Sequence, residues 1–315
     1  MATKEQIREA FIAEGFSSIV DDLEPLMKDA IGIIGEIKQD DQEIPVGASK
    51  LGGAPDLPSN EQWPYWQDGE PLSFICQLNL AEVTQHDVQQ VLPTSGMLYF
   101  FCDAQDERGV PPVGLPEEQG RWKVIYFDGD LSTLKRTPLP QEWVHHDDLG
   151  LDEDYFAPHA VSFYYQATIP SLYIHREKYS IGPIDIMDST DKAESDALFD
   201  KLDNMYQQIL LNPSHQLLGH PNEIQENDMR IGCQLASQGR DPWYHPDDAE
   251  SAEFMAGLEQ WRLFLQIDST KGYTGQFGVA GGMCWADGGI IYLWIREQDL
   301  RSKKFENAWL ALEST

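Results

Sequence analysis

The sequence LGGAPD at residues 51–56 recurs in blurred form as LLGHPN at residues 217–222. Two further blocks follow each copy in the same order, with spacers of different length between them. They are FICQLN at 74–79 with FLQID at 264–268, and GMLYFF at 96–101 with GIIYLW at 289–294. An ordered set of a turn block, a glutamine-bearing strand and a glycine-led aromatic strand predicts that the chain is built from two related halves.

The rest of the pattern predicts strands and helices that alternate irregularly, without the period of βαβ units. We therefore expect an α+β fold that is internally duplicated, with mainly antiparallel sheets and peripheral helices. Two pseudo-symmetric halves, approximately residues 1–175 and 176–315, are expected to share one core, so that the chain forms a single duplicated domain. A hydrophobic content of 41% over 315 residues is sufficient for such a core.

Local patterns place the individual elements. Thr3 with Gln6 forms a capping-box pattern that predicts a first helix, and a second helix is expected from Asp21. Further helices are expected at 79–91, 190–211 and 297–304, and strands near 31–37, 72–78, 97–102, 122–127, 159–169, 229–236, 261–267, 290–295 and 308–312.

The charge balance is strongly acidic, with 53 Asp and Glu against 22 Lys and Arg, a net charge of −31. Phosphate groups need a basic surface, so neither nucleic acid nor a membrane is expected as a partner. A basic protein would be attracted by this field, although acidity alone also favours solubility. The polar N-terminus and the absence of a long apolar run predict a cytoplasmic protein without a signal peptide or membrane span. The oligomeric state is left open.

Four cysteines, Cys76, Cys102, Cys233 and Cys284, are far apart in the sequence and form no C-x-x-C pair. Cys76 and Cys102 lie inside strand-like apolar runs. We expect all four to be reduced and mostly buried, rather than disulfide-bonded or bound to zinc.

The run HHDD at residues 145–148, with His159 nearby, is the most metal-like cluster. Adjacent histidines point to opposite sides of a strand and match no known ligand spacing, so we expect an acidic solvent-facing loop and assign no metal or other cofactor. The sequence also lacks a G-x-S-x-G motif and a phosphate-binding glycine loop. No catalytic residue is assigned, and a metal hydrolase built around His145 remains a third hypothesis.

The segment KLGGAPDLP at residues 50–58 resembles the YwqG-like family of bacterial proteins of unknown function. Similar segments are LSFICQLNL at 72–80, LPTSGMLYFF at 92–101, HQLLG at 215–219, LFLQIDS at 263–269 and IYLWIR at 291–296. The resemblance begins near Met27 and covers most of the chain. It implies an α+β fold with an internal duplication and no established activity. The occurrence of some relatives near secreted toxins implies an immunity-type toxin antagonist as one role.

Gln77 and Gln266 occupy corresponding positions in apolar strands, where a buried amide must be hydrogen-bonded. One hypothesis is structural, in which each amide holds backbone groups of the Gly-x-Pro turn of its own half. The other is functional, in which both amides face a ligand pocket between the halves. The further candidates for lining that pocket are Trp63, Trp66, Trp261, His215 and His220.

Two acidic segments, residues 141–158 and 241–260, each contain six acids and no Lys or Arg. The second also contains aromatic residues, a combination typical of protein-binding surfaces. A solvated helix whose aromatic side chains pack inward would have the same composition. The protein-binding candidates are Trp243, Tyr244, Asp247, Asp248 and Glu250.

The sequence therefore favours a non-catalytic cytoplasmic binding protein whose acidic surface engages a basic protein partner. The alternative is a small-molecule binder or an enzyme with a site between the two halves, near Gln77 and Gln266.

Overall fold

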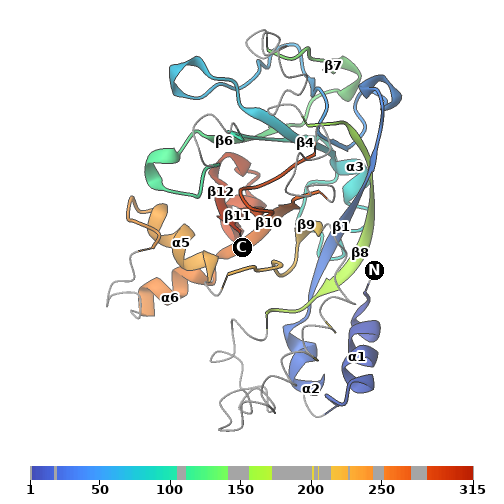
Figure 1. Ribbon diagram of the computed structural model, residues 1–315, viewed down its shortest axis with the longest axis vertical. Coiled ribbons are helices and arrows are strands. Elements are labelled where there is room, and N and C mark those ends of the chain that lie inside the picture. The colour runs from blue at the N-terminus through green and yellow to red at the C-terminus, as the bar shows by residue number, and fades with distance from the viewer. Residues whose placement is uncertain are drawn as a thin grey trace.

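Strands dominate the protein, whose computed structural model describes residues 2–17, 20–104, 111–140, 156–171, 201, 205, 214–225, 228–243, 252–270 and 282–314. Ten strands in these segments form one sheet, and every neighbouring pair in it is antiparallel (Figure 1). In spatial order they are β12 (Trp309–Glu313), β11 (Ile290–Arg296), β10 (Trp261–Asp268), β9 (His215–Leu218), β1 (Lys28–Ile37), β8 (His159–Thr168), β2 (Lys50–Leu51), β4 (Ser73–Asn79), β5 (Met97–Cys102) and β6 (Trp122–Phe127). A mainly antiparallel sheet combined with helices confirms the expected fold class at this level.

The two longest strands, β1 and β8, pair at the centre of the sheet and form a long ribbon along one side of the molecule (Figure 1). Beside β1 lies the short strand β9, followed by β10, β11 and β12. Beside β8 lies the short strand β2, followed by β4, β5 and β6. The register places Gly32 opposite Tyr164, and a side chain at Gly32 would overlap the tyrosine ring. The Tyr164 ring would therefore have to move if position 32 carried a larger residue.

The sheet curls until its two edge strands meet. Trp122, at the start of β6, donates from Nε1 to the carbonyl oxygen of Ala308 at 2.9 Å, and its ring centroid lies 5.3 Å from that of Trp309. Apolar side chains from the strands on either side of the central β1–β8 ribbon fill the space that the curled sheet encloses. There the ring centroids of Phe100 on β5 and Phe264 on β10 are 5.5 Å apart. One apolar cluster therefore contains residues from β4–β6 and from β10–β12.

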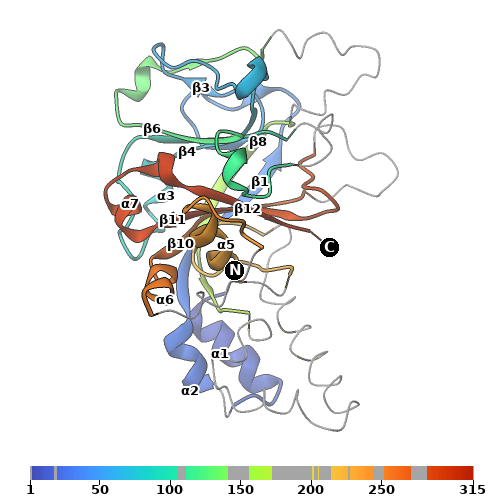
Figure 2. The ribbon, with the colours of Figure 1, turned by 90° about the vertical axis from the view of Figure 1, so that its left-hand side faces the viewer.

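Two N-terminal helices, α1 (Lys4–Ala13) and α2 (Val20–Leu23), lie at one end of the central ribbon (Figure 2). The predicted capping box is confirmed, because the Gln6 N–H donates to Thr3 Oγ1 at 3.2 Å and the Thr3 N–H donates to Gln6 Oε1 at 2.9 Å. Ile7 and Phe11 are buried in a cluster that includes Ala167 at the end of β8. This packing anchors the helices to the sheet.

The other elements surround the sheet. They are α3 (Leu80–Val83), α5 (Met229–Ala236), α6 (Ala252–Leu258) and α7 (Glu297–Arg301), with a second small sheet of β3 (Asp56–Leu57) and β7 (Lys135–Arg136). Among the described residues, no helix has both the length and the apolar character needed to cross a membrane.

Residues 229–236 form the helix α5, so the predicted strand there is wrong. Apolar residues alternate along MRIGCQLA as they do in a strand, but Met229, Cys233 and Ala236 also share one helical face, which is buried. Asp228 caps the helix by accepting a backbone hydrogen bond at 3.1 Å. The cap and the buried face together favour the helix over the strand.

The helix predicted at 79–91 begins as expected but is much shorter. Asn79 caps it by accepting from the Ala81 N–H at 3.1 Å, and α3 then ends at Val83. The chain continues in turns that Asp87 closes, because its Oδ2 accepts from the Leu92 N–H at 2.8 Å. The helix predicted at 190–211 lies outside the described residues, except for residues 201 and 205.

The four cysteines are free thiols. Cys76, Cys102 and Cys233 are buried, and Cys284 is partly exposed. Burial raises the pKa of the three buried thiols, so they stay protonated at neutral pH. A protonated, enclosed thiol is a poor nucleophile.

Candidate functional site

Gln77 on β4 is fully buried, and both polar atoms of its side chain have partners. Its Oε1 accepts from the Asp56 N–H at 2.7 Å, while its Nε2 donates to the Ala48 carbonyl oxygen at 2.8 Å and to Asp56 Oδ2 at 2.7 Å. Tyr99 on the next strand donates to the Asp56 carbonyl oxygen at 2.6 Å. The amide and the phenol therefore hold both sides of the turn at residues 51–56.

Gln266 on β10 is fully buried as well. Its Oε1 accepts from the Asn222 N–H at 2.8 Å, and its Nε2 donates to the carbonyl oxygen and the Oγ of Ser214 at 2.6 and 2.8 Å. Tyr292 on the next strand donates to the Asn222 carbonyl oxygen at 2.6 Å. The turn at residues 217–222 is thus held by the same three kinds of contact.

Replacing Gln77 by leucine is expected to lower the free energy of unfolding by about 1–3 kcal/mol, because it leaves the buried Asp56 N–H without an acceptor. Urea denaturation followed by circular dichroism measures this loss. The exposed Gln85 supplies a control, since Gln85→Leu should change the free energy by less than about 0.5 kcal/mol. An unchanged midpoint for Gln77→Leu would contradict the structural role of this amide.

Four charged side chains lie together beside the first turn, of which Lys50 and Asp56 are fully buried and Asp41 and Arg136 are partly exposed. Lys50, which is fully buried, donates to Asp41 Oδ1 at 2.9 Å and to the Ala54 carbonyl oxygen. Arg136 pairs through Nε with Asp56 Oδ1 at 2.5 Å and through Nη1 with Asp41 Oδ2 at 3.0 Å. Burial lowers the pKa of Lys50, and the two carboxylates act against this shift. Two cations and two anions balance in this network, as buried charges require.

The second turn makes similar contacts with amides. Gln216 pairs with Gln266 across the strands, just as Lys50 pairs with Gln77. Its Nε2 donates to the His220 carbonyl oxygen at 2.6 Å, and its Oε1 accepts from Gln166 Nε2 at 2.7 Å. Uncharged side chains therefore occupy the positions that carry charges beside the first turn.

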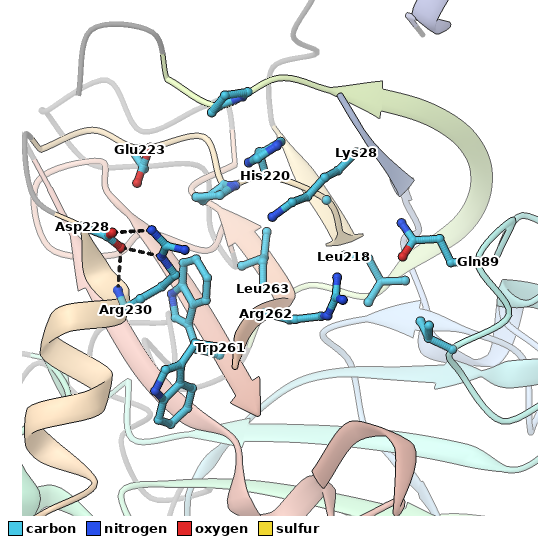
Figure 3. A pocket seen from close by; sticks show the side chains of 15 residues that line it. Lys28, Gln89, Leu218, His220, Glu223, Asp228, Arg230, Trp261, Arg262 and Leu263 are labelled. Atoms are coloured by element: carbon cyan, nitrogen blue, oxygen red, sulfur yellow. Dashed lines mark hydrogen bonds and ion pairs between the residues drawn. The ribbon is translucent and has the colours of Figure 1, made fainter. Parts of the chain in front are cut away.

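A pocket with a cavity volume of about 40 Å³ opens beside the second turn, where distant segments of the chain meet (Figure 3). It is lined by Lys28 of β1, Gln89 and Val91 after α3, Pro170 after β8, Leu218 of β9, residues 219–221 and 223 after β9, Asp228 and Arg230 at the start of α5, Trp261, Arg262 and Leu263 of β10, and Trp294 of β11. The position of β1 beside β9 brings Lys28 to the residues that follow β9.

Basic and acidic side chains are separated across the pocket. Glu223 and Asp228 lie on the side of Arg230, whereas Lys28 and Arg262 lie toward the opposite side (Figure 3). Asp228 accepts from Arg230 Nε at 2.8 Å and from its Nη2 at 2.5 Å, so this pair is locally neutral. Lys28 and Arg262 are therefore the basic residues on the side of the pocket away from Glu223 and Asp228.

Arg262 is held by one edge of its guanidinium group. Its Nε pairs with Glu297, which also pairs with Arg301 at 2.5 Å. The two terminal nitrogens of Arg262 make no hydrogen bond or ion pair with any described residue. The side chain is 39% exposed, so these donors are accessible from the pocket opening.

Two indole rings form the wall of the pocket. Trp261 donates from Nε1 to Gln234 Oε1 at 2.8 Å, and the Arg296 guanidinium lies 4.9 Å from the centroid of its ring. Trp294 is 4% exposed, and its Nε1 has no hydrogen-bond partner in the part of the chain that the structure describes. Among the described residues, the accessible donors of this pocket that lack acceptors are therefore the terminal nitrogens of Arg262.

A second hollow of about 80 Å³ lies between α5 and β12. Trp243 lines it and is 56% exposed, and apolar walls come from Ile231, Val113 and Leu312. Glu313 also lines this hollow. A large exposed aromatic ring beside an apolar hollow is typical of contact surfaces.

Glu313 is a buried carboxyl group with an unusual titration. Its Oε2 accepts from the N–H groups of Ile224 and Gln225 at 2.7 and 3.3 Å, while its Oε1 has no partner among the described residues. Burial raises the pKa of Glu313 from 4.5 to about 7, and the nearby Glu223 adds to the rise. The group therefore titrates near neutral pH.

The remaining pocket candidates lie elsewhere. His215 is buried and accepts at Nδ1 from the Asp268 N–H at 3.0 Å, and burial lowers its pKa to about 4. Trp63 donates to the Leu72 carbonyl oxygen at 2.8 Å and packs on the outer face of β5, and the Arg121 guanidinium lies over Trp66. Of the seven candidates, His220 and Trp261 line one cavity, and the described pockets do not join them to Gln77 or Gln266.

Several candidates fall outside the described residues, namely Tyr244, Asp247, Asp248, Glu250 and the HHDD run at 145–148. Within the described segments, no group of three or more His, Cys, Asp or Glu is arranged to hold a metal ion.

Residues 49–313 match the model of a protein family described as a domain of unknown function, DUF1963. The chain belongs to this family. No curated protein matches the chain. The DUF1963 span includes both turns and the hollow beside Trp243, and it leaves out α1, α2 and β1. Every residue that lines the pocket beside the second turn lies in the DUF1963 span except Lys28.

Sequence reasoning about this DUF1963 protein did not find Lys28, Gln89 or Arg262, because single polar residues in separate segments carry no local signal. The burial of Glu313 is only weakly indicated by the sequence, through its position as an acidic residue at the end of the apolar strand WLALE. The alternation of that strand places Glu313 on the same face as Trp309, which is buried.

Proposed function

We propose that this protein is a non-catalytic interaction protein that binds a basic protein partner at the hollow between α5 and β12. The observation that carries the proposal is the position of Trp243, which is 56% exposed and lines an apolar hollow. Tryptophan is the residue type most enriched among those that dominate binding energy, and its ring buries a large area on contact. Trp243 is the aromatic anchor in this proposal.

Charge supports a basic partner. The net charge of −31 would steer a cationic protein toward this surface. The buried Glu313 also lines the hollow and adds an acidic residue there. Asp247, Asp248 and Glu250 follow Trp243 closely in the sequence and are proposed to add to the steering field.

The YwqG-like segments within the DUF1963 span support a finer form of this proposal. In that form the protein is cytoplasmic, and its basic partner is a toxin that it antagonises. The support is the resemblance of those segments together with the acidic charge of the chain.

We also propose that the two halves are copies of one unit, related by a pseudo-two-fold axis. Support comes from the strand order on the two sides of β1 and β8 and from the matched contacts of Gln77 and Gln266. Leu51 of the first turn pairs with His159 of β8, and Leu217 of the second turn pairs with Ile31 of β1, so His159 corresponds to Ile31, 128 positions earlier. Ser162 lies 128 positions after Ile34, and these two residues are also paired with each other. The proposed axis therefore passes between Ile34 and Ser162.

Binding kinetics test the proposed function. A partner recovered at low salt is immobilised, and association and dissociation rates are measured by surface plasmon resonance at increasing salt. Trp243→Ala is expected to speed dissociation at least about tenfold, because a buried anchor acts on the bound state. Neutralising Asp247, Asp248 and Glu250 together is expected to slow association, and added salt should weaken the steering in the same way.

Tyr65 provides a matched control, because it is an exposed aromatic residue that does not line the hollow. Tyr65→Ala should leave both rates unchanged. Equal dissociation rates for Trp243→Ala and the native protein would rule out the hollow as the contact. A salt-insensitive association rate would rule out steering by the acidic surface.

A further inference from the structure

We infer that the pocket beside the second turn binds the carboxylate group of a small aliphatic molecule. This site is separate from the surface of Trp243 and goes beyond the proposed function. Lys28 of β1, Gln89 and Arg262 of β10 line it (Figure 3).

The charge of the pocket favours an anion. The chain has 22 basic residues against 53 acids, yet Lys28, Arg230 and Arg262 all line this one cavity. Asp228 neutralises Arg230 through two hydrogen bonds, and Glu223 lies on that same side (Figure 3). An anion that enters beside Lys28 and Arg262 therefore meets basic side chains, and it stays away from the two acids.

The unsatisfied donors favour a ligand group that has only acceptor atoms. Arg262 is fixed through Nε by Glu297, and this contact leaves the paired terminal nitrogens available as a fork. A carboxylate accepts two parallel hydrogen bonds from such a fork, which gives both strength and orientation.

The lining of the pocket favours a carboxylate that carries a short hydrocarbon chain over a fully polar anion. About 40 Å³ holds about three water-sized groups, which is the size of a carboxylate, and the rest of the ligand would lie along the pocket wall. Val91, Leu218 and Leu263 also line the pocket and would contact a short hydrocarbon chain attached to the carboxylate.

Butyrate is the probe for this inference, with butyramide as its neutral counterpart and inorganic phosphate as a larger anion. Binding is followed by isothermal titration and by the fluorescence of the pocket tryptophans, Trp261 and Trp294. The native protein is expected to bind butyrate saturably. Butyramide should bind at least about tenfold more weakly because it loses the charge-assisted pair, and phosphate should bind more weakly because it lacks a hydrocarbon chain for the apolar wall. Arg262→Gln is expected to weaken butyrate binding by a similar factor.

Arg301→Gln is the matched control, because Arg301 pairs with the same Glu297 but does not line the pocket. The Arg301→Gln variant should bind butyrate as the native protein does. If Arg262→Gln does not fold, Lys28→Gln provides a second pocket variant. The inference is overturned if butyrate does not bind saturably, if butyramide binds equally well, or if the folded pocket variants keep the native affinity. Equal losses in Arg301→Gln and Arg262→Gln would overturn it too, since the effect would then come from Glu297.

Discussion

Replacing Asp56 by asparagine is expected to lower the free energy of unfolding by about 3–5 kcal/mol, because it removes one charge from a buried, balanced network. Asp56 is fully buried, and its carboxylate accepts from Arg136 Nε at 2.5 Å and from Gln77 Nε2 at 2.7 Å. The substitution keeps the size of the side chain but leaves Lys50 and Arg136 with Asp41 as their nearby anion. Urea denaturation of the native protein and the variant measures the loss.

A second substitution should recover part of this stability. Gln216 and Asn222 hold the corresponding places beside the second turn without charges. Lys50→Gln combined with Asp56→Asn removes one cation and one anion and leaves Arg136 paired with Asp41. The double variant is expected to be more stable than the sum of the single losses predicts, with a coupling energy of about 1–3 kcal/mol.

The exposed Asp22 supplies the control for this cycle, because it makes none of these contacts. Asp22→Asn should leave stability within about 0.5 kcal/mol of the native value. Strictly additive losses in the double variant would contradict a coupled charge network. They would also weaken the proposal that the two turns are copies of one unit.

The native protein is expected to lose stability through Glu313 as the pH rises from about 4.5 to 7. The pKa of this group is raised to about 7 in the folded state from 4.5, so between these values the folded protein binds the proton more tightly than the unfolded chain. The penalty is absent below pH 4.5 and complete above pH 7, where it reaches about 3 kcal/mol. Glu313→Gln keeps an acceptor for Ile224 and Gln225 and cannot ionise, so it is expected to remove this dependence.

His215 acts with the opposite sign, so the total pH curve of the native protein hides both effects. Burial lowers the pKa of His215 to about 4 from 6.5, and its stabilisation is present above pH 6.5 and lost as the pH falls toward 4. Between pH 4.5 and 6.5, a rise in pH lowers the free energy of unfolding through Glu313 and raises it through His215. The informative quantity is therefore the difference between Glu313→Gln and the native protein.

Urea denaturation at pH 5 and pH 8 measures that difference. The native protein should lose about 2–3 kcal/mol relative to Glu313→Gln between these two values, since a shift of one pKa unit is worth about 1.4 kcal/mol. Asp22→Asn should follow the native protein at both values. Parallel behaviour of Glu313→Gln and the native protein would mean that Glu313 titrates as an ordinary exposed carboxyl group.

Local patterns in the sequence were sufficient to predict those elements whose stabilising contacts are themselves local. The capping box joins Thr3 to Gln6, three positions away, and the structure has both of its hydrogen bonds. The strand predicted from Trp122 to Phe127 has these bounds in the structure, because an apolar alternating run closed by a turn signal needs no distant information. The mainly antiparallel α+β class followed from the same kind of pattern.

The sequence also indicated that Gln77 and Gln266 needed hydrogen-bond partners, since an amide in an apolar strand is costly to leave unpaired. The identity of the partners came only from the tertiary structure. Asp56 and Ala48 lie 21 and 29 positions from Gln77, and the pairing of β2 with β4 brings them together.

Tertiary structure alone decided which charges are buried and which side chains share a pocket. Lysine is almost always exposed, so nothing in the sequence marked Lys50 as fully buried between Asp41 and a carbonyl oxygen. Lys28 and Arg262 are separated by most of the chain, and they line one cavity because β1 lies beside β9 and β9 beside β10. The physical reason is that strand order depends on which apolar faces can be buried together over long sequence distances. A local pattern specifies that a face is apolar, but not which other face will cover it.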